Sequence, residues 1–235
     1  MSIALEGIET INPIIYPPGC VAIAGSDLSR YTGFTVSLVG TYLPTGTTVS
    51  WITSSGVARN MNEAVQRGLD GGAAWFWCLG DDHVFAPNTL LRLLEHLNET
   101  RHIVAPLCLH RKDPFNPVVY QSRNVKGQFT PWPMHTLPLS GVHEVTAAGG
   151  AGMLVSRLVF ETMLSPWFDV GQIDPQDSSD DLHFQVKAQQ LGFKMYVDFD
   201  TTIGHLTPMA VWPRKNKEGQ WEVGLDTAAG LPGVK

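Results

Sequence analysis

The chain has 235 residues, of which 43% are hydrophobic, so it can build one large core and is not disordered as a whole. Acidic residues outnumber basic ones by 22 to 16, and the resulting net charge of −6 disfavours a dedicated nucleic-acid-binding protein. The 23 glycines and 16 prolines favour an α/β chain with many loops over a helical bundle.

Strand-like and helix-like segments alternate through the first half of the chain. We expect strands at 20–26, 47–55, 73–80 and 102–109, and helices at 58–69 and 88–97. Because strands that alternate with helices form right-handed crossovers, this order predicts an α/β fold with a Rossmann-type, mostly parallel central sheet flanked by helices.

The second half is less regular. Residues 110–145 are rich in proline and aromatic residues and predict loops with antiparallel hairpins, the small antiparallel part of the fold. Helices are expected at 153–164 and 178–192, and a strand is expected at 193–200. We therefore expect one catalytic domain over residues 1–208 and a peripheral C-terminal arm or tail over residues 209–235.

Cysteine usage and the N-terminal segment bear on the compartment. The widely spaced Cys20, Cys78 and Cys108 lie in or beside apolar runs and predict buried free thiols. The N-terminal segment lacks the basic and apolar regions of a signal peptide, and no apolar stretch reaches the about 18 residues of a membrane-spanning helix. We therefore expect a soluble, cytoplasmic protein.

Two carboxylates and an imidazole, Asp81, Asp82 and His83, directly follow the apolar strand at 73–80. Ligands of open α/β sheets bind at the carboxyl ends of the strands. Adjacent carboxylates repel each other there, and a divalent cation such as Mn²⁺ or Mg²⁺ relieves the repulsion. The alternative is a turn in which the aspartates only cap the next helix.

Three further features could carry chemistry. Asp180 and Asp181 open a predicted helix, where one carboxylate can stabilise the helix end and the other can act as a general base. His205 follows the strand at 193–200, and a lone histidine there is either structural or a ligand. A glycine-rich segment that contains Gly150 allows the backbone to approach a ligand closely, without the spacing of a dinucleotide-binding motif.

The order of these features resembles that of the GT-A glycosyltransferases, most closely their family-2-like branch. The matching segments run in the same order along residues 20–208: Gly56–Asn60, the Gly80–Leu90 segment after the apolar strand, Gly149–Arg157, and the helix from Asp180 to Gly192. The resemblance implies a GT-A-like fold and a metal-dependent glycosyltransferase of the hexosyltransferase type.

The resemblance also implies roles for individual residues. Asp82 matches the last aspartate of the DxD motif and, with His205, would bind the divalent metal, while Gly80 stands where the first aspartate is usual. Asp181 matches the catalytic base, with Asp180 beside it. The residues expected to contact the nucleotide-sugar are Asp27, Arg59, Asp81 and Gly150. The residues expected to contact the acceptor are His110, Arg111 and Trp132.

The implied donor is a nucleotide-sugar, with a UDP-sugar as the first candidate, and the implied acceptor is a glycan, a protein or modified DNA. The small size is similar to that of phage or bacterial enzymes, and a phage-encoded chain would work in the host cytoplasm. Three alternatives remain: a glycosyltransferase for modified phage DNA bases, a nucleotidyltransferase, and a protein that binds sugars or nucleotides without catalysis.

Overall fold

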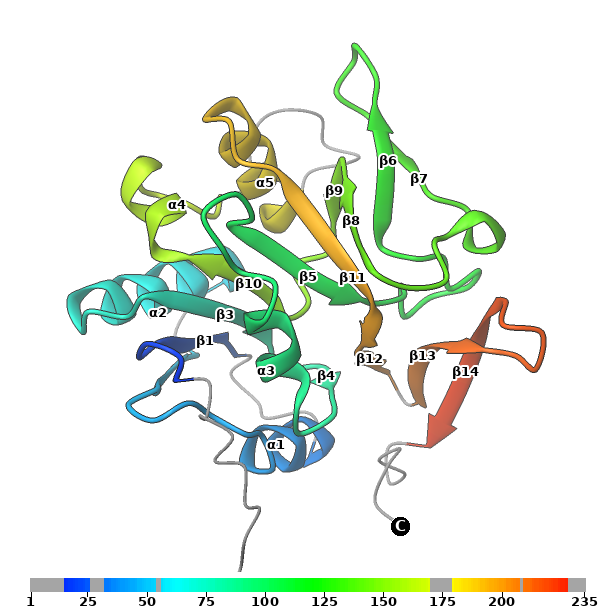
Figure 1. The fold of residues 1–235 in the computed structure, drawn as a ribbon, viewed down its shortest axis with the longest axis horizontal. Coiled ribbons are helices and arrows are strands. Elements are labelled where there is room, and N and C mark those ends of the chain that lie inside the picture. The colour runs from blue at the N-terminus through cyan, green and yellow to red at the C-terminus, as the bar shows by residue number, and fades with distance from the viewer. Residues whose placement is uncertain (1–14, 26–31, 54–55, 170–178, 208, 228–235) are drawn as a thin grey trace, which may run out of the picture.

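The computed structural model describes residues 15–25, 32–53, 56–169, 179–207 and 209–227. A seven-stranded sheet lies at its centre, formed by β1 (Cys20–Ala24), β2 (Thr48–Ile52), β3 (Trp75–Gly80), β5 (Ile103–Leu107), β8 (Val142–Val145), β10 (Met153–Ser156) and β11 (Met195–Thr202). The strand order is β2-β1-β3-β10-β5-β11-β8 (Figure 1). Only β10 and β8 run antiparallel to their neighbours, so the predicted mostly parallel sheet is confirmed.

Helices cover both faces of this sheet, as expected from the alternation of elements. Helices α2 (Val57–Asp70), α4 (Arg157–Thr162) and α5 (Asp180–Gln190) pack on one face, and α1 (Thr32–Val39) and α3 (Thr89–Leu94) pack on the other (Figure 1). Each face has its own apolar cluster, because the strands between them are buried on both sides.

Two smaller sheets adjoin the central one. The four-stranded sheet has the order β14-β13-β12-β4 and contains β4 (His83–Val84), β12 (Gly204–Leu206), β13 (Met209–Lys215) and β14 (Trp221–Thr227). The three-stranded sheet has the order β7-β6-β9 and contains β6 (Val119–Arg123), β7 (Phe129–Pro131) and β9 (Ala147–Ala148). A 3₁₀ turn, η1 (Met134–Thr136), follows β7. The antiparallel β6–β7 pair confirms the hairpin expected in residues 110–145.

The helix predicted at 153–164 is wrong in its first part. Residues Met153–Ser156 form β10, which pairs with β3 on one side and β5 on the other, and the helix begins only at Arg157. The apolar Met-Leu-Val run suits a buried strand as well as a helix. Its position between β3 and β5 selects the strand, because pairing there provides hydrogen-bond partners for the backbone N–H and C=O groups of all three strands.

The last described residues form an antiparallel hairpin, β13–β14, which pairs with β12. The hairpin lies beside β12 at the lower right of Figure 1. The sequence predicted only an arm or a tail here, and the domain boundary at residue 208 stays a prediction. The three cysteines are buried and free, as expected. No helix in the described part of the chain has both the length and the apolar composition needed to cross a bilayer.

Candidate active site

Three parallel strands deliver polar side chains to one edge of the central sheet. Asp81 and Asp82 follow β3, Cys108 follows β5, and His205 lies on β12, directly after β11. The strands run in the same direction, so the chain leaves each of them on the same side of the sheet. The topology therefore gathers residues that lie more than a hundred positions apart in sequence.

The short strands β4 and β12 bring two histidines together. They pair antiparallel with His83 opposite His205, and the two imidazole rings stack with their centroids 4.6 Å apart. The Asp82 carboxylate contacts both rings, with Oδ1 3.0 Å from His83 Nδ1 and Oδ2 3.2 Å from His205 Nε2. Arg111 donates to the same Oδ2 at 3.0 Å. Asp82 is thus the shared anion of three cationic or polar side chains.

The charges at this edge are strongly coupled. Burial alone would disfavour the ionised Asp82, but the charge of His83 and the hydrogen bonds of His205 and His83 outweigh burial and lower the pKa of the carboxyl. Burial also disfavours protonated imidazoles, yet Asp82 raises the pKa of both His83 and His205. Asp82 is therefore an anion over the physiological pH range.

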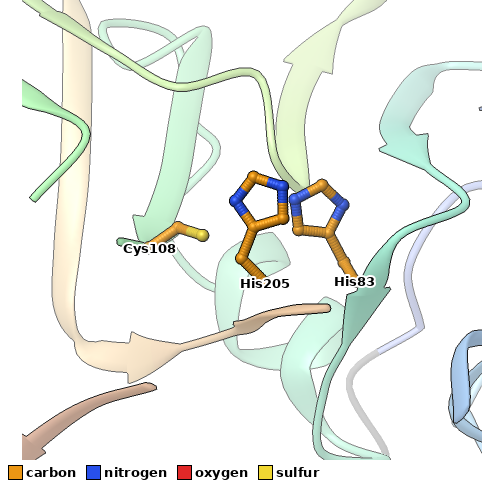
Figure 2. A group of neighbouring side chains, drawn as sticks. All are labelled: His83, Cys108 and His205. Atoms are coloured by element: carbon orange, nitrogen blue, oxygen red, sulfur yellow. The ribbon is translucent and has the colours of Figure 1, made fainter. Parts of the chain in front are cut away.

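Cys108 lies against the same pair of imidazoles. One donor atom from each of His83, Cys108 and His205 lies within 4.8 Å of the other two, and Figure 2 shows the thiol beside the His205 ring. Burial opposes the thiolate, but the neighbouring imidazoles of His205 and His83 lower the pKa of Cys108 to about 7. A thiol in this position is poised to become an anionic ligand.

The donor set fits a bound cation. Two ligands that each lie about 2.1 Å from one ion are roughly 3 Å apart when they meet at a right angle. The 3.2 Å between Asp82 Oδ2 and His205 Nε2 matches this separation. A second observation agrees: His83 Nε2 is buried and has no hydrogen-bond partner among the described residues. The 3.2 Å separation fits the metal-binding role of Asp82 and His205, which stays a prediction, and the unpartnered nitrogen indicates room for a ligand beside His83.

A second acidic group comes from the N-terminus of α5. Asp181 accepts two backbone N–H groups, from Gly150 at 2.6 Å and from Leu182 at 2.8 Å. One turn later the buried Gln185 hydrogen-bonds both backbone groups of Ala148. These contacts fasten α5 to residues 148–150, so the orientation of the Asp181 carboxylate is fixed by two separate parts of the chain.

Asp180, the neighbour of Asp181, is partly buried. Burial and the charge of Asp181 raise the pKa of Asp180 to about 6, although backbone hydrogen bonds act in the opposite direction. Between about pH 4 and pH 6, Asp180 therefore keeps its proton in the folded protein, whereas an aspartate of the unfolded chain has lost its proton.

This shift predicts a pH-dependent stability difference. Because the folded state holds the Asp180 proton more tightly, the contribution of Asp180 to stability is present below about pH 4 and is lost as the pH rises to about 6. The stability of the wild type relative to Asp180→Asn should fall across this interval and stay constant above about pH 7. Urea denaturation of both proteins at each pH measures this difference in the free energy of unfolding. A difference that does not change with pH would contradict the raised pKa.

The two acidic groups line one cavity of about 480 Å³. Its lining contains the following predicted site residues: Asp81, Asp82, His110, Arg111, Gly150, Asp180, Asp181 and His205. His83 and Cys108 line it as well. The volume lies within the range of about 300–1,000 Å³ that is typical of small-molecule sites. Residues from β3, the loop after β5, the segment after β9, α5 and β12 thus meet in one place.

Three predicted residues are not placed at this cavity. Arg59 is exposed in the first turn of α2, outside the cavity lining. Trp132 also lies outside the lining and packs edge-to-face against Phe199, with ring centroids 6.3 Å apart. Asp27 lies outside the described residues. Their roles in nucleotide or acceptor binding stay predictions.

Sequence reasoning missed two residues of the site. The sequence predicts only a buried thiol for Cys108, although its place directly after a buried strand is the same signal that singles out Asp81 and Asp82. Gln185 carried no signal of its own beyond being a polar residue on the buried face of α5. Its role appears only when β9 is placed against that face.

Comparisons with known proteins agree with this architecture. The family model described as Glycosyl transferase family 2 matches residues 41–164. The crystal structure of A197 from STIV superposes with a TM-score of 0.59 at 15% sequence identity, over 92% of this chain and 98% of that chain. This likeness supports the fold. No curated protein matches the chain in sequence.

Two further crystal structures are more distant. That of GalNAc-T7 with UDP, GalNAc and Mn2+ gives a TM-score of 0.49 at 12% identity, over 68% of this chain and 32% of that chain. That of S. aureus TarS 1-349 gives 0.47 at 13% identity, over 78% and 58%.

The matched segment extends from β2 to α4 and includes Asp81, Asp82, Cys108 and Gly150 of the cavity. It covers more than half of the 235 residues. The chain belongs to glycosyl transferase family 2 and has a GT-A-like fold.

Proposed function

We propose that the protein transfers a sugar from a nucleotide-sugar to an acceptor hydroxyl and that a divalent cation assists the reaction. The observation that carries this proposal is the single cavity of about 480 Å³ that both acidic groups line, Asp81–Asp82 together with His205 and Asp180–Asp181. A nucleotide-sugar needs one group of residues to receive its diphosphate and another to activate the acceptor. A UDP-sugar is the first donor to test.

Asp82 and His205 would hold the cation in this proposal, since their donor atoms lie 3.2 Å apart. A cation bound there supplies positive charge that stabilises the departing diphosphate. Arg111, which pairs with Asp82 at 3.0 Å and is partly exposed, adds a guanidinium suited to phosphate oxygens at the same edge. Asp81 also lines the cavity and is our candidate for contact with the nucleotide.

Asp181 is the proposed general base. Its carboxylate is held by the N–H groups of Gly150 and Leu182, so it presents a fixed acceptor to a hydroxyl group in the cavity. In an inverting reaction Asp181 removes the proton of the acceptor hydroxyl as the new glycosidic bond forms. Asp180 lies beside it and contributes a second carboxyl, with a pKa of about 6.

The acceptor is proposed to enter along the loop that follows β5. A second cavity, of about 460 Å³, is lined by residues 110–114 and 116 and shares His110, Arg111 and His205 with the first. Backbone hydrogen bonds between His110 and Asn116 and between Val118 and Cys108 close the base of this loop. His110 and Arg111 are therefore the acceptor contacts that we retain from the sequence.

A thermal-shift screen of nucleotide-sugars, each with and without Mn²⁺, tests the proposal. A bound donor raises the melting temperature in proportion to the logarithm of its concentration over Kd, so the true donor stands out from the other nucleotide-sugars. Incubation with that donor and Mn²⁺ should then release a nucleoside diphosphate. Release of pyrophosphate would indicate nucleotidyl transfer instead, and donor binding without turnover on any acceptor or water would indicate a binding protein.

The cation site can be tested by two substitutions. Asp82→Ala and His205→Ala should each weaken Mn²⁺-dependent donor binding on the order of 10–100-fold, because each removes a charged or ligating group from the cation. Isothermal titration with and without Mn²⁺ measures the effect. His135→Ala, which removes an exposed imidazole on η1, is the matched control. Unchanged Mn²⁺-dependent binding in both variants would refute the assignment.

A further inference from the structure

His83 and Cys108 are not accounted for by a cation held only at Asp82 and His205. Both are nine-tenths or more buried, with His83 6% exposed and Cys108 3% exposed, and both line the active-site cavity. His83 Nε2 has no hydrogen-bond partner among the described residues. A buried polar nitrogen without a partner costs free energy unless a ligand satisfies it.

The two residues stand next to His205 and present donor atoms of the same chemical kind. The donor atoms of His83, Cys108 and His205 lie within 4.8 Å of one another (Figure 2). Donors around a tetrahedral zinc ion are spaced about 3.3–3.8 Å apart, so small side-chain rotations would close the group around one ion. Three side chains from β4, β12 and the end of β5 thus converge on one point.

Asp82 completes the pattern expected around a metal-binding histidine. Histidines that ligate a metal usually donate their other ring N–H to a carboxylate, which fixes the tautomer and the orientation of the ring. Asp82 contacts a ring nitrogen of both His83 and His205, at 3.0 Å and 3.2 Å. Each imidazole therefore has a carboxylate on one nitrogen. The other nitrogen of His83 has no hydrogen-bond partner among the described residues, whereas that of His205 lies 3.1 Å from the Leu109 carbonyl oxygen, a contact that metal binding at this nitrogen would replace.

The chemistry of this donor set selects among cations. Thiolate and imidazole are soft or borderline ligands that favour zinc and its neighbours in the first transition row, whereas Mg²⁺ and Ca²⁺ favour oxygen ligands. We infer that His83, Cys108 and His205 bind one transition-metal ion of the Zn²⁺ or Co²⁺ type. The cation of this active site would then be thiolate-ligated, with Asp82 orienting the two imidazoles instead of binding the ion directly. The inference rests on the proposed function for the role of the ion, but its binding is tested without any nucleotide.

Titration of the metal-free, full-length protein with Co²⁺ tests this inference. Binding of one Co²⁺ per chain should produce visible d–d bands and a near-ultraviolet charge-transfer band from thiolate to cobalt. Cys108→Ser should abolish the near-ultraviolet band, and Cys20→Ala should keep it. Cys20 is an equally buried thiol at the opposite end of the sheet, so it controls for loss of a cysteine as such. Zn²⁺ should displace the cobalt, and a large excess of Mg²⁺ should not.

Three results would overturn the inference: cobalt binding without the near-ultraviolet band, a band that persists in Cys108→Ser, or displacement by Mg²⁺ at concentrations similar to those of Zn²⁺. If Cys108→Ser does not fold, the inference is tested by the near-ultraviolet band of the wild type and by the Co²⁺ affinity of His83→Gln, which should be weaker. If the inference about the thiolate ligand fails, the proposed function is not thereby refuted, since donor binding with Mn²⁺ would still support glycosyl transfer. A thiolate-cobalt band in a protein that binds no nucleotide-sugar would refute only the proposed function.

Discussion

Asp181→Asn is expected to lower the rate of sugar transfer by about 10²–10⁴-fold, the range in which a general base contributes to catalysis. Asparagine keeps the size of the side chain and an oxygen that can accept the Gly150 N–H, which Asp181 Oδ2 accepts at 2.6 Å. It cannot take a proton from the acceptor hydroxyl. Donor affinity should therefore stay unchanged while kcat falls, and product formation with titration of the donor measures both.

The controls for this substitution separate the two neighbouring carboxylates. Asp180→Asn should lower transfer much less than Asp181→Asn does. Asp70→Asn changes an exposed carboxylate at the C-terminal end of α2 and should leave transfer unchanged. If Asp180→Asn were the inactive variant and Asp181→Asn the active one, the assignment of the base would be reversed.

Gly150→Ala should both destabilise the protein and slow transfer. A Cβ at residue 150 would lie 2.7 Å from the Asp181 Cβ, closer than two carbons can approach, so the start of α5 must move. Such overpacking costs about 1–3 kcal/mol. A displacement of about 1 Å at a catalytic group can cost on the order of 10²-fold in rate.

Thermal unfolding and steady-state kinetics measure the two effects of Gly150→Ala. Gly71→Ala is the matched control, because a Cβ there meets only ordinary contacts, 3.4 Å from the Arg67 carbonyl oxygen, and the backbone φ of −77° suits alanine. Wild-type stability and transfer in Gly150→Ala would show that Asp181 does not depend on this contact.

Much of the fold could be predicted because its elements carry their own local signals. The buried strands β1, β3 and β5 are apolar runs bounded by polar or glycine-rich segments, and α2 has apolar residues at helical spacing. β10 could not be predicted this way. Its Met-Leu-Val run fits a strand or a helix, and only its place between β3 and β5 selects the strand.

Candidate site residues could be predicted where the reactive side chain and the strand or helix that positions it lie in the same short segment. Asp81 and Asp82 stand directly after a strand, and Asp180 and Asp181 stand at the start of a helix, so each pair could be found from the local sequence. Cys108 also stands directly after a strand, but only its closeness to His83 and His205, which lie far away in the sequence, places it in the site. The acceptor role of Trp132 stays a prediction: this aromatic residue of a proline-rich loop packs against Phe199, outside the cavity that the acidic groups line.

The sequence by itself determined the alternation of strands and helices, the acidic residues at their ends and the resemblance to one family. Only the tertiary structure decided that β4 pairs with β12, which sets His83 against His205 and both against Asp82, and that Gly150 holds Asp181. The physical reason is the range of the interactions. Periodicity and capping act over a few residues, whereas antiparallel pairing and packing join segments separated by thirty to more than a hundred residues, and no local pattern specifies the partner.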